Sequence, residues 1–189
     1  MAFARGFKSQ CERRAAEFRK QFGLEPHDPL SADRLASELT VTVWATTDIA
    51  GISTSSMMVL NDEADQSWSA LTMRMGPSHL IVHKPVASRG RKNSVVMHEM
   101  AHIILGHELA TACILEDGSL VPGNFNQTQE DEADWLAGAL LLPRAALLSI
   151  RQRQLSDREA CEEHLVSLDM LKWRYRMTGV DIQFSRRSA

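Results

Sequence analysis

Residues 94–106 read SVVMHEMAHIILG, and this stretch decides most about the fold. Its apolar residues recur at the spacing of one helical face, and Ser94 and Gly106 are typical helix ends. In a helix, positions four apart lie one turn above each other, so the imidazoles of His98 and His102 point to the same side. The stretch therefore predicts a helix that presents two histidines at the spacing of ligands to one metal ion.

Glu99 follows the first of these histidines and would project beside the metal position. From there a carboxylate can reach a water but does not readily become a ligand. This arrangement is typical of a metal-activated water that is served by a carboxylate base. The alternative is a partly buried helix whose histidines only satisfy local hydrogen bonds.

A catalytic zinc site needs three protein ligands and one open position. Residues 130–136 read EDEADWL and offer four acidic candidates, Glu130, Asp131, Glu132 and Asp134. Acidic residues in the first turn of a helix also stabilise the helix dipole, which explains most such clusters. Here the helix then becomes apolar on nearly all sides, which predicts that it is buried and that acids at its mouth need partners. A metal held by the first helix would supply one.

The composition is that of an ordinary globular chain. The 189 residues are about one domain in length, 44% of them hydrophobic and 24% charged. With a net charge of −3, the chain lacks the excess of basic residues that is typical of nucleic-acid-binding proteins, so no direct nucleic-acid partner is expected. No apolar run approaches the ~20 residues of a membrane span, and the first residues have no secretory signal pattern. Together with three scattered cysteines, these features predict a cytoplasmic protein with no membrane partner.

The remaining pattern predicts an α+β fold that is mostly helical, with a small sheet formed early in the chain. Strands are expected at residues 40–44, 57–60, 71–75 and 79–83, and helices at 8–22, 31–39, 94–105, 128–142, 143–153 and 157–177. Loops are expected at residues 85–93 and 116–127, with Ser94 and Thr128 as helix caps.

The histidine-bearing segment and the acidic segment together resemble a known family. HEMAHIILGH at residues 98–107 and EDEADWLAGALLLPR at 130–144 are similar to the ImmA/IrrE-type metallopeptidases. These carry H-E-x-x-H and, about thirty residues later, E-x-x-A-[DN]-x-F-A-x-x-L-L-x-P; Leu136 stands here where the family usually has Phe. The likeness implies a minimal zincin, in which a twisted N-terminal sheet packs on the active-site helix. The chain length predicts a single domain over residues 1–189, and the likeness, which covers about residues 25–180, suggests a zinc-protease core at about 25–150 and a C-terminal helical region at about 151–180.

The resemblance also implies roles for individual residues. The zinc ligands would be His98, His102 and Glu130, and the catalytic base Glu99. Helical geometry agrees, because Glu130 and Asp134 share one face, whereas Asp131 and Glu132 are rotated away by ~100° and ~200°. We expect Asp134 to accept the outer N–H of His98, and Glu132 to serve only the helix dipole.

Other polar residues are weaker candidates. His107 lies beyond the helix stop, so it is expected to support a ligand or lie at the surface rather than bind the metal. His164, Arg174 and Tyr175 could stabilise an oxyanion, but a surface or core role is the simpler expectation for them.

By resemblance, the chain is a zinc-dependent endopeptidase that cleaves a helix-turn-helix transcriptional repressor of a prophage, mobile element or stress response. The edge of the small sheet could hold an extended substrate by strand addition. The alternative is a non-catalytic regulatory metal-binding protein that docks a transcription factor, and a third reading is hydrolysis of a non-peptide bond. Glu99 separates the first two, since a structural metal site needs no carboxylate base.

Overall fold

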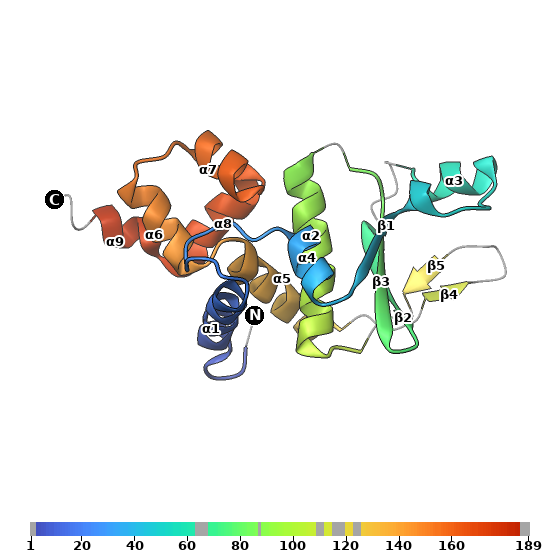
Figure 1. Cartoon of the computed structure of the whole chain (residues 1–189), viewed down its shortest axis with the longest axis horizontal. Coiled ribbons are helices and arrows are strands. Elements are labelled where there is room, and N and C mark those ends of the chain that lie inside the picture. Colours follow the sequence, from blue (N-terminus) through green and yellow to red (C-terminus); the bar gives the residue numbers. More distant parts are fainter. Residues whose placement is uncertain are drawn as a thin grey trace.

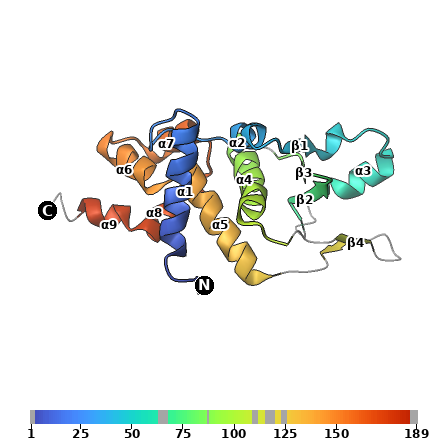
Figure 2. The same ribbon diagram turned by 60° about the horizontal axis from the view of Figure 1, so that its bottom comes forward.

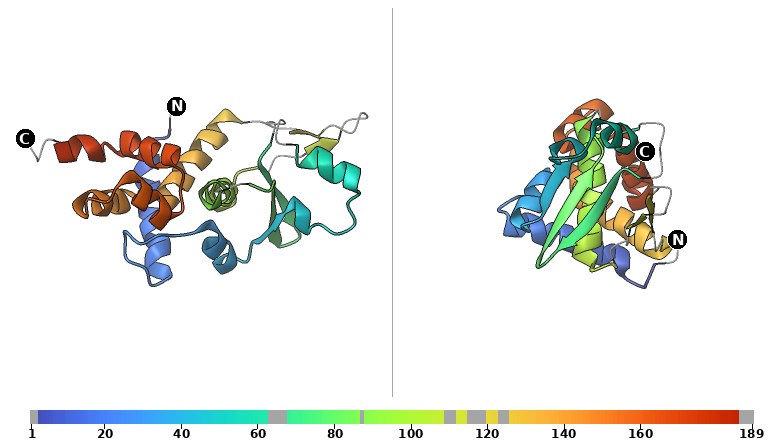
Figure 3. Two further views of the ribbon diagram at one scale, coloured as in Figure 1. Left: turned by 90° about the horizontal axis from the view of Figure 1, so that it is seen from above. Right: turned by 90° about the vertical axis from the view of Figure 1, so that its right-hand side faces the viewer.

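A long helix, α4 (Arg89–Leu105), runs through the middle of the molecule. A three-stranded sheet lies on one side of it and helix α5 (Gln127–Leu141) on the other (Figure 1; Figure 3, left). This is the predicted mostly helical α+β fold, with a small sheet packed on the histidine-bearing helix. The computed structural model describes residues 3–62, 68–86, 88–108, 112–114, 120–122 and 126–185.

The sheet has the order β1–β3–β2. Strand β1 (Thr42–Ala45) pairs in parallel with β3 (Ser78–His83), and β2 (Ala70–Met75) pairs antiparallel with β3 across a tight turn. Gly76 takes the left-handed conformation that this turn requires, with φ +60°. The predicted hairpin is therefore confirmed, and β2 stands at an edge of the sheet.

The remaining elements surround this centre. Helix α1 packs along α5, which places it on the far side from the sheet (Figure 2). The C-terminal helices gather at the opposite end of the molecule from the sheet (Figure 1). These elements are α1 (Phe7–Gln21), α2 (Ala32–Glu38), the 3₁₀ turn η1 (Thr46–Asp48), α3 (Thr54–Leu60), β4 (Ala112–Ile114), β5 (Leu120–Pro122), α6 (Arg144–Gln152), α7 (Asp157–His164), α8 (Leu168–Thr178) and α9 (Val180–Ser185).

Helix α5 forms the spine of the core, as its apolar sequence predicts. Its residues from Trp135 to Leu141 are all buried. Gly138 allows α8 to approach, because an added Cβ would collide with the ring of Trp173 and lie 2.9 Å from Cδ of Arg174. This close packing fixes α8 against the C-terminal half of α5.

Two buried arginines satisfy backbone carbonyls where α5 ends. Arg19 donates from Nη2 to the carbonyl of Leu140 at 2.8 Å, and Arg174 donates from Nε to that of Leu142 at 2.9 Å. Both cations complement the negative end of the helix dipole. A surface or a core role was expected for Arg174, His164 and Tyr175, and all three are buried in this helical region.

The start of α4 differs from the prediction. Residues 85–93 were expected to be a loop with Ser94 as the cap, but the helix begins at Arg89, and the side chain of Ser88 accepts from the N–H of Arg91. Asn93 explains the difference, because its Oδ1 accepts from the N–H of Ala32 and its Nδ2 donates to the carbonyl of Leu165. These contacts from distant segments stabilise the extra turns.

The expected strand at residues 57–60 is wrong: these residues belong to helix α3. Ser53 caps this helix through a hydrogen bond from the N–H of Ser56, and Met58 and Val59 remain largely exposed. Four apolar residues are too few for periodicity to separate a strand from a helix, and the cap decided the outcome.

Three further boundaries differ. Asn126, not Thr128, caps α5, since its Oδ1 accepts from the N–H groups of Thr128 and Gln129. Within the expected loop at 116–127, strand β5 pairs with β4; the rest of that loop up to residue 125 lies outside the described residues. The expected helix at 157–177 is two helices, because Leu165 adopts a left-handed conformation with φ +53°.

Among the helices that the structure describes, none is by itself both long and apolar enough to cross a membrane. Taken together, α5 and α6 are long and apolar enough, but they are bent by 42° at their junction.

Candidate metal centre

Helices α4 and α5 bring two imidazoles and one carboxylate to a single point. His98 and His102 come from α4 and Glu130 from α5, and one ligand atom of each lies within 4.8 Å of the others. The two Nε2 atoms are 3.0 Å apart, and the Glu130 oxygens lie 3.1 Å from His98 Nε2 and 3.6 Å from His102 Nε2. These are the three residues that the sequence indicated as ligands.

Local structure explains why these side chains converge. The four-residue spacing places both histidines on one face of α4. On α5, the Asn126 cap begins the helix so that Glu130 falls in its first turn. The side chains are 24%, 12% and 34% exposed for His98, His102 and Glu130, so the group is partly shielded but open to solvent on one side.

The donor set fits a divalent transition metal. Two imidazole nitrogens and one carboxylate oxygen are the three protein ligands of many catalytic metal sites, which leave a fourth position for water or substrate. This geometry supports a metal cofactor.

The charges within the group are strongly coupled. Burial lowers the pKa of His98, but hydrogen bonds to Asp134 and Glu130 outweigh burial and raise the pKa to about 10. Hydrogen bonds to His102 and His98 hold the pKa of Glu130 far below its usual value. Without a metal, the group is therefore an ion pair between a protonated imidazole and a carboxylate, and a metal cation would replace the proton.

Asp134 lies behind His98. Its Oδ1 is 2.9 Å from His98 Nδ1, the ring nitrogen that faces away from the metal position. The Asp134 side chain is 58% exposed. Its place, one turn after Glu130 on α5, is the one that the helical spacing predicts.

Glu99 points to the sheet side of α4. The hydroxyl of Thr72, on edge strand β2, donates a hydrogen bond to Glu99 Oε2 at 2.6 Å. Thr72 is paired with the buried Ile81 of β3 and so lies on the sheet face that packs against α4. This contact ties the carboxylate to the sheet, and nothing in the sequence around Thr72 signals it.

Two more residues join the group behind His102. His107 Nδ1 lies 3.0 Å from His102 Nδ1, and His107 Nε2 lies 3.2 Å from Glu132 Oε2. Burial lowers the pKa of His107 and outweighs the hydrogen bond to Glu132, which raises it. The expectation that Glu132 serves only the helix dipole is therefore wrong. The available signal was His107 itself, five residues after His102 and directly after the helix stop at Gly106.

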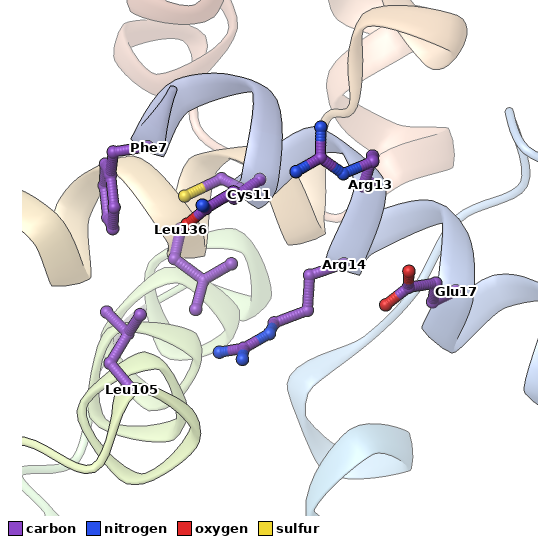
Figure 4. A pocket seen from close by; sticks show the side chains of 8 residues that line it. Phe7, Cys11, Arg13, Arg14, Glu17, Leu105 and Leu136 are labelled. Atoms are coloured by element: carbon purple, nitrogen blue, oxygen red, sulfur yellow. The ribbon is translucent and has the colours of Figure 1, made fainter. Parts of the chain in front are cut away.

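A separate hollow of about 320 Å³ lies between α1, the end of α4 and α5 (Figure 4). The Arg14 side chain reaches across it and donates from Nη1 to the carbonyl of Ile104 at 3.0 Å. None of the histidines and acids described above lines it. Its lining residues are Phe7, Gln10, Cys11, Arg13, Arg14, Glu17, Leu105 and Leu136.

Comparison with known proteins identifies the family. A search of curated proteins gives no match to the chain. The family model of the IrrE N-terminal-like domain (Peptidase_M78) matches residues 52–178, more than half of the chain. The match spans α3 to α8 and includes all the residues of the metal group, and it confirms the resemblance seen in the sequence. The chain therefore belongs to the IrrE N-terminal-like family of metallopeptidases.

Proposed function

We propose that the protein is a zinc-dependent endopeptidase. The observation that carries the proposal is the group of His98, His102 and Glu130, whose ligand atoms lie within 4.8 Å of one another, with Glu99 next to the first histidine. Two nitrogens and one oxygen at a partly exposed position suit zinc with an open fourth position. Membership of a metallopeptidase family supports the reaction class.

Within this site, Glu99 is the general base. A bound zinc ion supplies Lewis-acid chemistry, polarising the substrate carbonyl and making water more acidic. Glu99 accepts a proton from the attacking water and delivers it to the nitrogen of the leaving amine, which lets the peptide bond break. Thr72 holds Oε2 of the carboxylate, and among the described residues Oε1 has no hydrogen-bond partner that would compete for the proton.

The edge of the sheet supports an extended substrate. Strand β2 is an edge strand, and its Thr72 contacts Glu99 directly. A peptide that adds to β2 as a further strand would therefore run past the base and the metal group. We propose this edge as the place where the scissile segment binds.

The proposed substrate is a helix-turn-helix transcriptional repressor, cleaved so that its target genes are expressed. This step rests on the resemblance to ImmA/IrrE-type peptidases and not on the geometry of the site. A repressor substrate would place the reaction in the cytoplasm.

Metal analysis tests the proposal first. The protein purified without chelators should contain about one zinc per chain, as expected for a single three-ligand site. His102→Ala should contain little zinc, whereas His27→Ala, which removes a half-exposed histidine that is not part of the metal group, should match the wild type. Elemental analysis measures the zinc content of the wild type and of both variants. No stoichiometric metal in the wild type, even after zinc is added, would refute the metalloenzyme.

The second part of the test uses a purified helix-turn-helix repressor, taken from next to this gene where one is encoded there. Wild-type protein should cleave it, a chelator should stop cleavage, and added zinc should restore it. Cleavage that persists in the metal-free protein would contradict the proposal.

Zinc affinity should rise with pH over an unusually wide range. His98 must lose its proton to bind zinc, and its pKa in the metal-free protein is raised to about 10. Affinity should therefore increase roughly tenfold per pH unit up to about pH 9, whereas a histidine with an ordinary pKa near 6.5 would give a plateau well below that. Competition titrations with a chelating dye measure this slope.

Asp134→Asn is the matched variant for the pH experiment. It removes a hydrogen bond that raises the pKa of His98, so its affinity should level off at a lower pH. An affinity in the wild type that is constant from about pH 7.5 upward would contradict the raised pKa.

Thr72→Val should lower kcat by about 10- to 100-fold, the usual range for a hydrogen bond to a charged group. Valine keeps the shape of threonine but cannot hold Glu99, and KM should stay near wild type because Thr72 contacts the base. Thr72→Ser should restore most of the rate. The control is Thr42→Val, the same exchange at an exposed position of β1. A normal kcat for Thr72→Val would show that the hydroxyl does not position Glu99.

A further inference from the structure

A chain of polar contacts begins at His102 and leads away from the metal position. Nε2 of His102 faces His98 and Glu130, and its Nδ1 lies 3.0 Å from Nδ1 of His107. The other nitrogen of His107 lies 3.2 Å from Glu132 Oε2. Both ring nitrogens of His107 are therefore engaged, and neither is available as a further metal ligand.

The end of α4 positions His107 against His102. Gly106 ends α4 in the left-handed conformation, with φ +68°, and turns the chain back so that the N–H of His107 bonds to the carbonyl of His102 at 3.1 Å. The two imidazoles meet edge to face, 5.0 Å apart at their centroids. The His107 side chain is only 7% exposed and that of Glu132 22%, so both are more shielded than Asp134 at 58%.

Only one arrangement of protons satisfies these contacts once a metal is bound. A metal ligand nitrogen carries no proton, so a His102 that binds through Nε2 must be protonated on Nδ1. That N–H donates to His107, whose Nδ1 must then be the acceptor. The proton of His107 is left on Nε2, where it donates to Glu132. The Glu132 carboxylate therefore determines the tautomer of His107, and His107 in turn determines the tautomer of His102.

We propose that His107 and Glu132 are a positioning pair for the metal centre: together they fix the orientation of the His102 ring and keep its proton on Nδ1. The inference rests on the proposed metal site. The two histidine ligands are then oriented in different ways. His98 contacts the exposed carboxylate of Asp134 directly, whereas His102 is linked to the Glu132 carboxylate through the buried imidazole of His107. The pair also makes α5 a source of three functional carboxylates, those of Glu130, Glu132 and Asp134.

Zinc affinity, measured by competition with a chelating dye on the full chain, tests the pair. Glu132→Leu, which has no acceptor at this position, and His107→Phe should each weaken zinc binding by about 10- to 100-fold, the usual cost of losing an outer partner of a ligand. His107→Asn should recover most of the affinity, because its amide oxygen can accept where Nδ1 did. The control is Asp131→Asn on the same helix turn, whose side chain contacts Gln127 instead, and it should bind as the wild type does.

The visible absorption of the cobalt-substituted protein gives a second readout that a loss of stability alone would not move. The spectrum should change in Glu132→Leu and His107→Phe and return toward wild type in His107→Asn. Should His107→Phe fail to fold, Glu132→Leu still decides, because leucine is similar in size to glutamate and position 132 lies at the partly exposed end of the chain of contacts. Wild-type affinity and an unchanged spectrum in Glu132→Leu would overturn the pair alone. A wild-type protein that binds no metal would overturn the proposed function as well.

Discussion

Glu99→Gln should reduce peptide cleavage by about 100- to 10,000-fold, the range that a general base contributes, while zinc content and fold stay unchanged. Glutamine has the size of glutamate and can still accept the hydrogen bond from Thr72, but its amide cannot take a proton from water. The rate of repressor cleavage, measured on samples of equal zinc content, checks this expectation.

Glu38→Gln is the matched control for this variant. It makes the same exchange at an exposed position at the end of α2 and should cleave normally. Wild-type cleavage by Glu99→Gln would show that Glu99 is not the base. The same variant also separates the regulatory alternative: if it activates the target genes as fully as the wild type, the chain acts by docking a transcription factor.

Glu130→Ala should lose most of its zinc. Glu130 is the one member of the metal group that comes from α5, and without it only the two α4 histidines remain. The loss of affinity should exceed the ~10–100-fold that we expect for Asp134→Ala, which removes only the outer partner of His98. Zinc titration of the three proteins should therefore rank them wild type, Asp134→Ala and Glu130→Ala, in order of falling affinity.

Asp131→Ala gives the matched control, since it removes the next acid of the same helix and should keep wild-type zinc content. Asp131 accepts a hydrogen bond from Gln127 at an exposed position and makes no contact with the histidines among the described residues. Undiminished zinc affinity in Glu130→Ala would show that another group is the third ligand and that the assumed face of α5 is incorrect.

Much of the fold follows from local patterns in the sequence. The apolar run of α5 predicts a buried helix, and the strands around Gly76 predict the hairpin. Local signals failed where distant segments decide the structure. The first turns of α4 form because Asn93 bridges Ala32 and Leu165, and no window of sequence around residues 85–93 contains those partners.

The same division holds within the site. The sequence by itself determined His98, Glu99 and His102, since a four-residue spacing acts within one helix, and it indicated Glu130 and Asp134 as neighbours on one face of the next. Only the tertiary structure decided that Thr72 holds Glu99 and that Glu132 reaches His107. Helical periodicity determines which side chains share a face of a helix, and it follows from the spacing of residues in the sequence alone. A hydrogen bond between two elements depends on how those elements pack, because a shift of about 1 Å separates a bond from a gap.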